Sequence, residues 1–153
     1  MITAPTMPQL LETIRDELGD KVMPHVDDAP TKVAIEMMQA VLNALIERAE
    51  NEFAWMFEEM AAVEAAAGEM GPGLGSAALD SALAEFQGNR TESMTLSAVT
   101  ADYQRASEVL SRLAEAAYGA GDEAAIETVQ GLIDARLATE NAAIGEFIAV
   151  GRD

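Results

Sequence analysis

The single histidine, His25, is the first candidate for acid–base chemistry in this sequence. A histidine can act as a general base toward a serine hydroxyl, and Ser76 is a serine that another part of the chain supplies. His25 follows Pro24 at the end of an expected helix, where the helix dipole favours a histidine. We therefore interpret His25 as a turn residue and predict no catalytic residue.

Pairs of carboxylates are the candidates for binding a metal ion, because hard divalent cations prefer oxygen ligands. None of the pairs belongs to a calcium-loop pattern, and one histidine cannot supply the two Glu-x-x-His motifs of a di-iron bundle. The sequence has no cysteine, which excludes zinc–thiolate sites and thiol nucleophiles. We predict no metal and no cofactor. The pairs considered are Glu58 with Glu59, Glu47 with Glu50, and Glu12 with Asp16.

The charge of the chain restricts its partners. Its 153 residues include 27 acidic and 9 basic side chains, a formal net charge of −18. Such a field repels phosphate groups, so we predict no binding to nucleic acid or to an anionic membrane. The carboxylates fit solvated helix faces, and a basic partner or a cation would be other uses of them. Because no apolar run approaches the ~18 residues of a membrane span and no leader pattern opens the sequence, a cytoplasmic protein is expected.

One long helix, from Ala29 to about Glu69, organises the predicted fold. Asp28 can cap its start, and Pro30 suits its first turn. The glycines of segment 68–76 are expected to end it and form a flexible connector; without a preceding strand or a following lysine, this segment is not a phosphate-binding loop. At ~1.5 Å per residue the helix spans roughly 60 Å, so one end must kink, protrude or meet another chain. Its apolar stripe is Met38, Leu42, Leu45, Ala49, Phe53, Met56, Met60 and Val63.

Four further helices are expected to pack with it in a single domain, 1–153. We predict an all-α fold, an antiparallel bundle of four main helices plus one short helix. Ser76 and Asp122 are expected N-caps, and Gly19 is expected to weaken or bend the end of the first helix. The four helices are expected over Met7–Met23, Ala77 to about Gln87, about Glu92 to Tyr118, and Asp122 almost to the C-terminus.

Apolar residues at helical spacing predict which face of each of these helices is buried. In the first helix they are Leu10, Leu11, Ile14, Leu18 and Val22. In the short helix they are Leu79, Leu83 and Phe86. In the last two helices they are Leu96, Val99, Tyr103, Ala106, Leu110, Leu113 and Ala117, and then Ile126, Val129, Ile133, Leu137, Ile144, Phe147 and Ile148.

The aromatic segment FAWMF, 53–57, suggests an interface. Trp55 projects almost opposite the other large apolar residues and has glutamates on its own face, so this part of the helix is apolar on two sides. Either another layer of the same chain or another subunit must cover Trp55. Tryptophan is enriched at binding hot spots, and methionine suits adaptable surfaces. The predicted partner-binding residues are Phe53, Trp55, Met56, Phe57 and Met60.

Three segments are distinctive as a set: LLETIRDELGDKVMPHV near the start, NAL at 43–45, and ARLATENAA around Leu137 and Asn141. Together they resemble a family of small helical bacterial proteins. That family accompanies aminoglycoside-phosphotransferase-like kinases and acyl-CoA dehydrogenases, as in levulinate-type hydroxyacyl-CoA catabolism. Glu50 stands where the family pattern has an arginine, and Ala142 where it has a proline. The resemblance implies a partner of a kinase-like enzyme and carries over no catalytic residue.

Three functions follow as hypotheses. The first is a non-catalytic partner subunit that binds and supports a phosphotransferase-like enzyme. The second is a self-associating protein, a homodimer in which the overhang of the long helix pairs with its symmetry mate. The third is an enzyme or small-ligand binder, which requires a pocket with convergent polar groups inside the bundle. Asn43 can lie in the core, where its amide needs hydrogen bonds, or on the surface.

Overall fold

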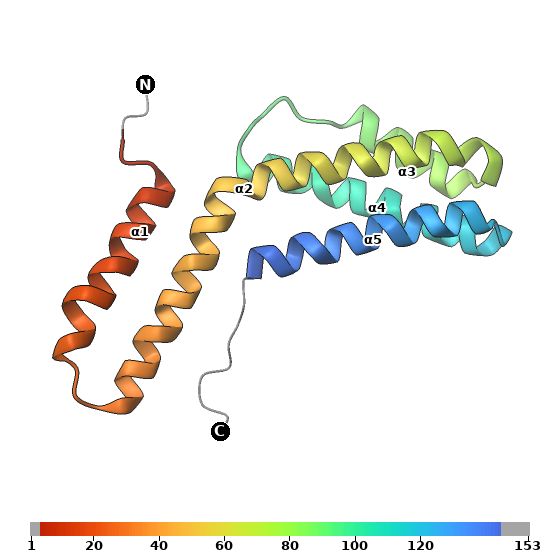
Figure 1. Ribbon diagram of the computed structural model, residues 1–153. Coiled ribbons are helices and arrows are strands. Elements are labelled where there is room, and N and C mark those ends of the chain that lie inside the picture. Colours follow the sequence, from red (N-terminus) through yellow and green to blue (C-terminus); the bar gives the residue numbers. More distant parts are fainter. Residues whose placement is uncertain (1–3, 145–153) are drawn as a thin grey trace. The chain divides into compact units, whose positions relative to one another are not determined.

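A computed structural model describes residues 4–144 of the chain (Figure 1). These residues form five α-helices and contain no strand, which confirms the predicted all-α class. A π-helical turn and a 3-10 turn follow the first helix. In chain order the elements are α1 (Met7–Glu17), the π-helical turn (Leu18–Val22), the 3-10 turn (Met23–His25), α2 (Ala29–Leu74), α3 (Ala77–Gly88), α4 (Leu96–Ala120) and α5 (Glu123–Ile144).

The described residues divide into two compact units. Unit 1 contains residues 4–52 and 139–144, and unit 2 contains residues 53–138. The long helix α2 contributes its first part to unit 1 and its second part to unit 2. The expected single domain stays a prediction.

The starts of α2, α3 and α5 lie where capping residues predict them. The backbone N–H of Thr31 donates to Asp28 Oδ2 at 2.9 Å, and hydrogen bonds from Thr31 hold the pKa of the Asp28 carboxyl below its ordinary value. Ser76 Oγ accepts from the backbone N–H of Leu79 at 3.3 Å at the start of α3. The Asp122 carboxylate accepts two backbone N–H groups at the start of α5. These local bonds satisfy donors that a helix leaves unpaired at its first turn.

The end of α2 differs from the prediction. Most of the expected connector at 68–76 is helical, because α2 continues through Pro72 to Leu74. Gly75 then ends it with a left-handed φ of +59°, and its N–H donates to the carbonyl of Gly71 at 3.2 Å. A glycine inside a helix costs about 1 kcal/mol and an interior proline such as Pro72 about 3 kcal/mol, and the packing of this last stretch offsets these costs. Met70 and Leu74 pack against the core.

Replacing Gly68 with alanine is expected to raise the free energy of unfolding by about 0.5–1 kcal/mol, because Gly68 is an exposed helical residue. A Cβ at this position would meet no atom within 4 Å. Urea denaturation followed by circular dichroism measures the change. Gly75→Ala is the matched control and should destabilise, since its φ is positive. A Gly68→Ala protein with unchanged or lower stability would show that this turn is not helical in solution.

The end of α1 also differs. A regular helix was expected to reach Met23, but α1 ends at Glu17 and the wider π-helical turn follows. Gly19 lies in that turn, as the expectation of a weakened or bent end anticipated. A Cβ on Gly19 would lie 2.6 Å from Gln39 Nε2, so glycine leaves room for the Gln39 side chain. Gln39 Nε2 donates to the carbonyl of Arg15 at 3.3 Å and thereby links α1 to α2.

The start of α4 lies later than expected. The helix begins at Leu96 and not near Glu92, because the buried carboxylate of Asp102 holds the preceding loop. The backbone N–H of Thr91 donates to Asp102 Oδ2 at 3.1 Å, which keeps that residue outside the helix. Helix α5 is described as far as Ile144. Its expected continuation through Phe147 and Ile148 lies outside the described residues.

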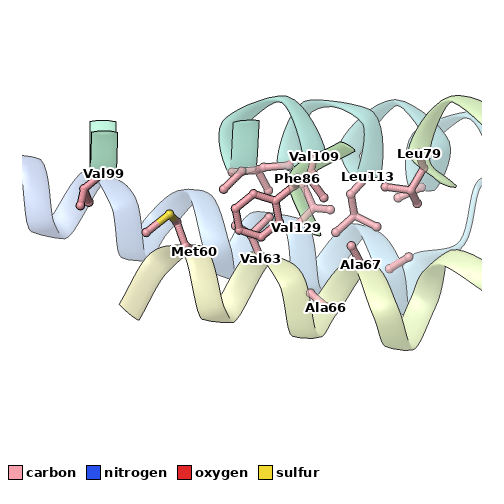
Figure 2. Close-up of a cluster of buried hydrophobic side chains, with 14 residues drawn as sticks. Met60, Val63, Ala66, Ala67, Leu79, Phe86, Val99, Val109, Leu113 and Val129 are labelled. Carbon is pink, nitrogen blue, oxygen red and sulfur yellow. The ribbon is translucent and has the colours of Figure 1, made fainter. Parts of the chain in front are cut away.

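Unit 2 contains the hydrophobic core. Its helical segments contribute side chains that point toward one another, with Phe86 of α3 among them (Figure 2). The stripes predicted for α3 and for most of α4 are confirmed, although Leu96 is 48% exposed. In α5, Val129 is buried but Ile133 and Leu137 are exposed. The largest fully buried side chains are Phe86, Met60, Leu79, Leu113, Val63, Val99, Val109 and Val129.

Candidate docking surface on the first helical hairpin

Unit 1 leaves much of its apolar surface exposed, which contradicts part of the buried stripes expected for the first helix and for the start of α2. Leu11, Leu18 and Leu42 of those stripes are half-buried. The exposed members are Leu10, Ile14, Val22, Met38, Leu45 and Ala49. In residues 4–52, Ile35 is the only fully buried side chain. The physical reason is that two helices alone can bury only the strip between them. Large apolar side chains in this range that are 43–63% exposed are Met7, Leu10, Ile14, Val22, Met37, Met38, Val41 and Leu45.

A hairpin of two helices presents these residues. Within unit 1, α1 lies beside the N-terminal part of α2 and runs antiparallel to it (Figure 1). Polar contacts fix the pairing: Arg15 Nη1 donates to Asn43 Oδ1 at 2.9 Å, and Gln39 donates to the Arg15 carbonyl. Asn43 is therefore an exposed residue whose amide is hydrogen-bonded across the hairpin.

The hairpin groove is the apolar depression between α1 and α2. It has a volume of about 420 Å³, and all its lining side chains are aliphatic or methionine. At roughly half exposure each, the large apolar residues of the hairpin present on the order of 600 Å², near the ~800 Å² that one partner buries in a standard interface. An apolar patch of about 600 Å² is at the upper end of what typical monomers expose, and such patches are often functional. The groove is lined by Ile14, Leu18, Met37, Met38, Val41 and Leu42.

The segment that forms the hairpin has a net negative charge. Residues 4–52 include ten acidic and four basic side chains, a formal charge of −6. Three of the four basic residues form ion pairs inside the unit: Arg15 with Asp16 at 2.8 Å, Lys21 with Glu17 at 3.7 Å, and Arg48 with Glu52. Seven carboxylates and Lys32 remain outside these three pairs, so the net charge of residues 4–52 stays negative.

The aromatic segment, 53–57, belongs to unit 2, whereas the residues of the hairpin groove belong to unit 1. Met60 is 1% exposed and belongs to the core, so its side chain is not available to a partner in this structure. Phe53, Met56 and Phe57 pack against that core, while Trp55 is half-buried. The partner-binding role of this segment stays a prediction.

Sequence reasoning did not single out Met37 and Val41, which line the groove.

A polar network that the sequence did not reveal joins three helices of unit 2. The Tyr103 hydroxyl donates to Glu59 Oε2 at 2.6 Å, and Arg136 Nε donates to Glu59 Oε1 at 2.6 Å. Arg136 also donates to Ser107 Oγ at 2.8 Å, and its guanidinium lies 5.4 Å from the centre of the Tyr103 ring. The four side chains satisfy one another across α2, α4 and α5, which is the arrangement of a structural network.

The candidates for chemistry, His25 and Ser76, line neither the hairpin groove nor a second, small cavity of unit 2. His25 is exposed at the end of the 3-10 turn, and the Ser76 hydroxyl takes part in the α3 cap. Between residues 4 and 144, no three histidine, aspartate or glutamate side chains are gathered so as to hold a metal ion. A second cavity, beside Arg105 in unit 2, has a volume of about 50 Å³. It has room for a water molecule or two but not for a substrate.

None of the helices in the described part of the chain is long and apolar enough to cross a membrane. Comparison with protein-family models, with curated proteins and with solved structures finds no match.

Proposed function

We propose that this protein is a non-catalytic helical partner protein that binds another protein through the hairpin groove. The observation that carries the proposal is the concentration of half-exposed, large apolar side chains on α1 and the start of α2. Exposed apolar residues that gather at one depression are typical of a site of protein–protein interaction, and Ile14, Met37, Met38 and Val41 do so in the hairpin groove. The groove has no polar lining residue, so it offers binding and no chemistry.

The resemblance described above supports a phosphotransferase-like kinase as the partner, in the cytoplasm. Under this proposal the chain supports that enzyme through contacts and adds no catalytic residue. Within unit 2, the second part of α2 is proposed to pack with α3, α4 and α5 as antiparallel neighbours, because short connections between consecutive helices favour that arrangement. The connection between α2 and α3 consists of only Gly75 and Ser76.

A homodimer is the second candidate, and the same surface favours it. Two hairpins related by a two-fold axis would cover each other's apolar faces and place four helices together. The charge of −6 on residues 4–52 opposes this pairing, because it brings two acidic surfaces into contact. We therefore rank a different protein above a second copy as the partner.

Replacing Met38 with aspartate is expected to abolish partner binding. Met38 is 50% exposed and lines the groove, so the variant should fold while a charge in the interface weakens binding about a hundredfold or more. The measurement is affinity capture from the native lysate with the bound protein quantified against the bait.

Met94→Asp is the matched control, since Met94 is 66% exposed and lies in the loop before α4. It should retain the partner at wild-type stoichiometry. Equal retention by the Met38→Asp protein would overturn the proposal. Loss of the partner in Trp55→Ala instead would move the interface to the aromatic segment.

A further inference from the structure

We infer that the element bound in the hairpin groove is a basic amphipathic helix of the partner, an inference that rests on the proposed function. The first support is the shape of the groove. Ile14 and Leu18 line one side at a spacing of four residues, and Met38, Val41 and Leu42 line the other at spacings of three and four. Two parallel rows of this kind accept the apolar stripe of a third helix, whose anchors recur at i, i+3, i+4 and i+7.

The second support is the type of lining residue. Met37 and Met38 lie side by side in the sequence and each is about half exposed. Methionine is unbranched and polarizable, so it adapts to the side chains of a bound helix, and methionine-rich surfaces are typical of proteins that repack around their partners. The absence of polar lining groups leaves the apolar contact without a directional hydrogen bond, which suits a helix because its backbone is internally bonded.

The third support is charge, and it selects a basic helix. Residues 4–52 carry a formal charge of −6, and Arg15, Lys21 and Arg48 are already paired with carboxylates of the same unit. A helix with lysine or arginine beside its apolar stripe would place its aliphatic stems along the groove edges and its charges among the carboxylates. A second copy of this chain would bring in a further −6 instead.

The test uses three synthetic peptides of about 18 residues. Two of them have leucine at i, i+3, i+4 and i+7, and the third has the same composition without that spacing. One carries lysine beside the stripe, the second carries glutamate there, and the third is a scrambled form of the lysine peptide. Each is titrated into the full chain by calorimetry at low and moderate salt. The lysine peptide should bind with one-to-one stoichiometry, at least about tenfold more tightly than either other peptide, and more weakly as salt increases.

Two variants locate the binding. Val41→Asp should weaken the lysine peptide about tenfold or more, and Met94→Asp should leave its affinity unchanged. The inference is overturned if the lysine and glutamate peptides bind equally, if the scrambled peptide binds as well as the ordered one, or if Val41→Asp has no effect.

Light scattering on the wild-type chain and on Met38→Asp separates this inference from the proposed function. A wild-type dimer that becomes monomeric in the variant would put a second copy in the groove and overturn both the basic-helix inference and the binding of a different protein. A monomer whose partner capture is lost in Met38→Asp, but which binds the lysine and glutamate peptides equally, would overturn the basic-helix inference alone. If the chain is a monomer and the Met38→Asp protein captures as much partner as the wild type, the docking function of the groove is overturned, and the inference with it.

Discussion

Truncation of Phe86 to alanine is expected to lower the free energy of unfolding by about 3–5 kcal/mol, because it removes a large ring from a closely packed core. Phe86 is fully buried on α3 and lies among core side chains of the neighbouring helices (Figure 2). The guanidinium of Arg90 lies 5.5 Å from the centre of its ring and would lose that contact as well. The substitution should therefore expand or dissolve the packing of unit 2.

Guanidinium denaturation of the full chain, followed by circular dichroism and by Trp55 fluorescence, measures this loss. Leu83→Ala on the same helix is the control, because it also truncates an apolar side chain to alanine and introduces no glycine into the helix. Leu83 is partly buried against the core and should lose less stability than Phe86. A loss for Phe86→Ala no larger than that for Leu83→Ala would contradict the position of Phe86 at the centre of the core.

Replacing Arg136 with alanine is expected to lower the free energy of unfolding by about 2–3 kcal/mol. The substitution leaves the Glu59 carboxylate, whose side chain is 14% exposed, without its ion-pair partner. It also removes the donor to Ser107 Oγ. The value lies below that of a fully buried pair because the Arg136 side chain is 24% exposed and water screens the charge.

A double variant tests the cause of this loss. Arg136→Leu combined with Glu59→Leu should be less destabilising than Arg136→Ala alone, because no unpaired carboxylate remains. Arg112→Ala is the surface control, since Arg112 pairs with two exposed glutamates on its own helix and should change the denaturation midpoint little. An Arg136→Ala midpoint equal to that of Arg112→Ala would show that the network contributes nothing to stability.

The sequence predicted the features that depend on neighbouring residues. Asp28, Ser76 and Asp122 cap helices because a short side chain next to an apolar repeat needs only local geometry. The end of α2 was predicted wrongly because the packing of Met70 and Leu74 acts over a distance and outweighs the local preference of glycine. The link between Glu59 and Arg136 joins residues 77 positions apart, and no local pattern reports it.

The candidate site was predicted only in part. Helical periodicity identified Ile14, Leu18, Met38 and Leu42 as apolar, but periodicity shows which face is apolar and not what covers it. The sequence therefore predicted burial for Ile14 and Met38, which the hairpin leaves exposed. A usable signal was present: two helices in the first part of the chain carry more large apolar residues than one shared strip can bury. The aromatic segment attracted the prediction because tryptophan is typical of interfaces.

Site-specific photocrosslinking tests the docking function most directly. A photoreactive phenylalanine analogue at position 41, in the hairpin groove, is compared with the same group at position 55, in the aromatic segment, and at position 94, in the loop before α4. After irradiation in the native lysate, mass spectrometry identifies each adduct. We predict one dominant adduct with a different protein at position 41 and none at position 94. Adducts at position 55 but not 41, or equal labelling at 41 and 94, would contradict the hairpin groove as the docking surface.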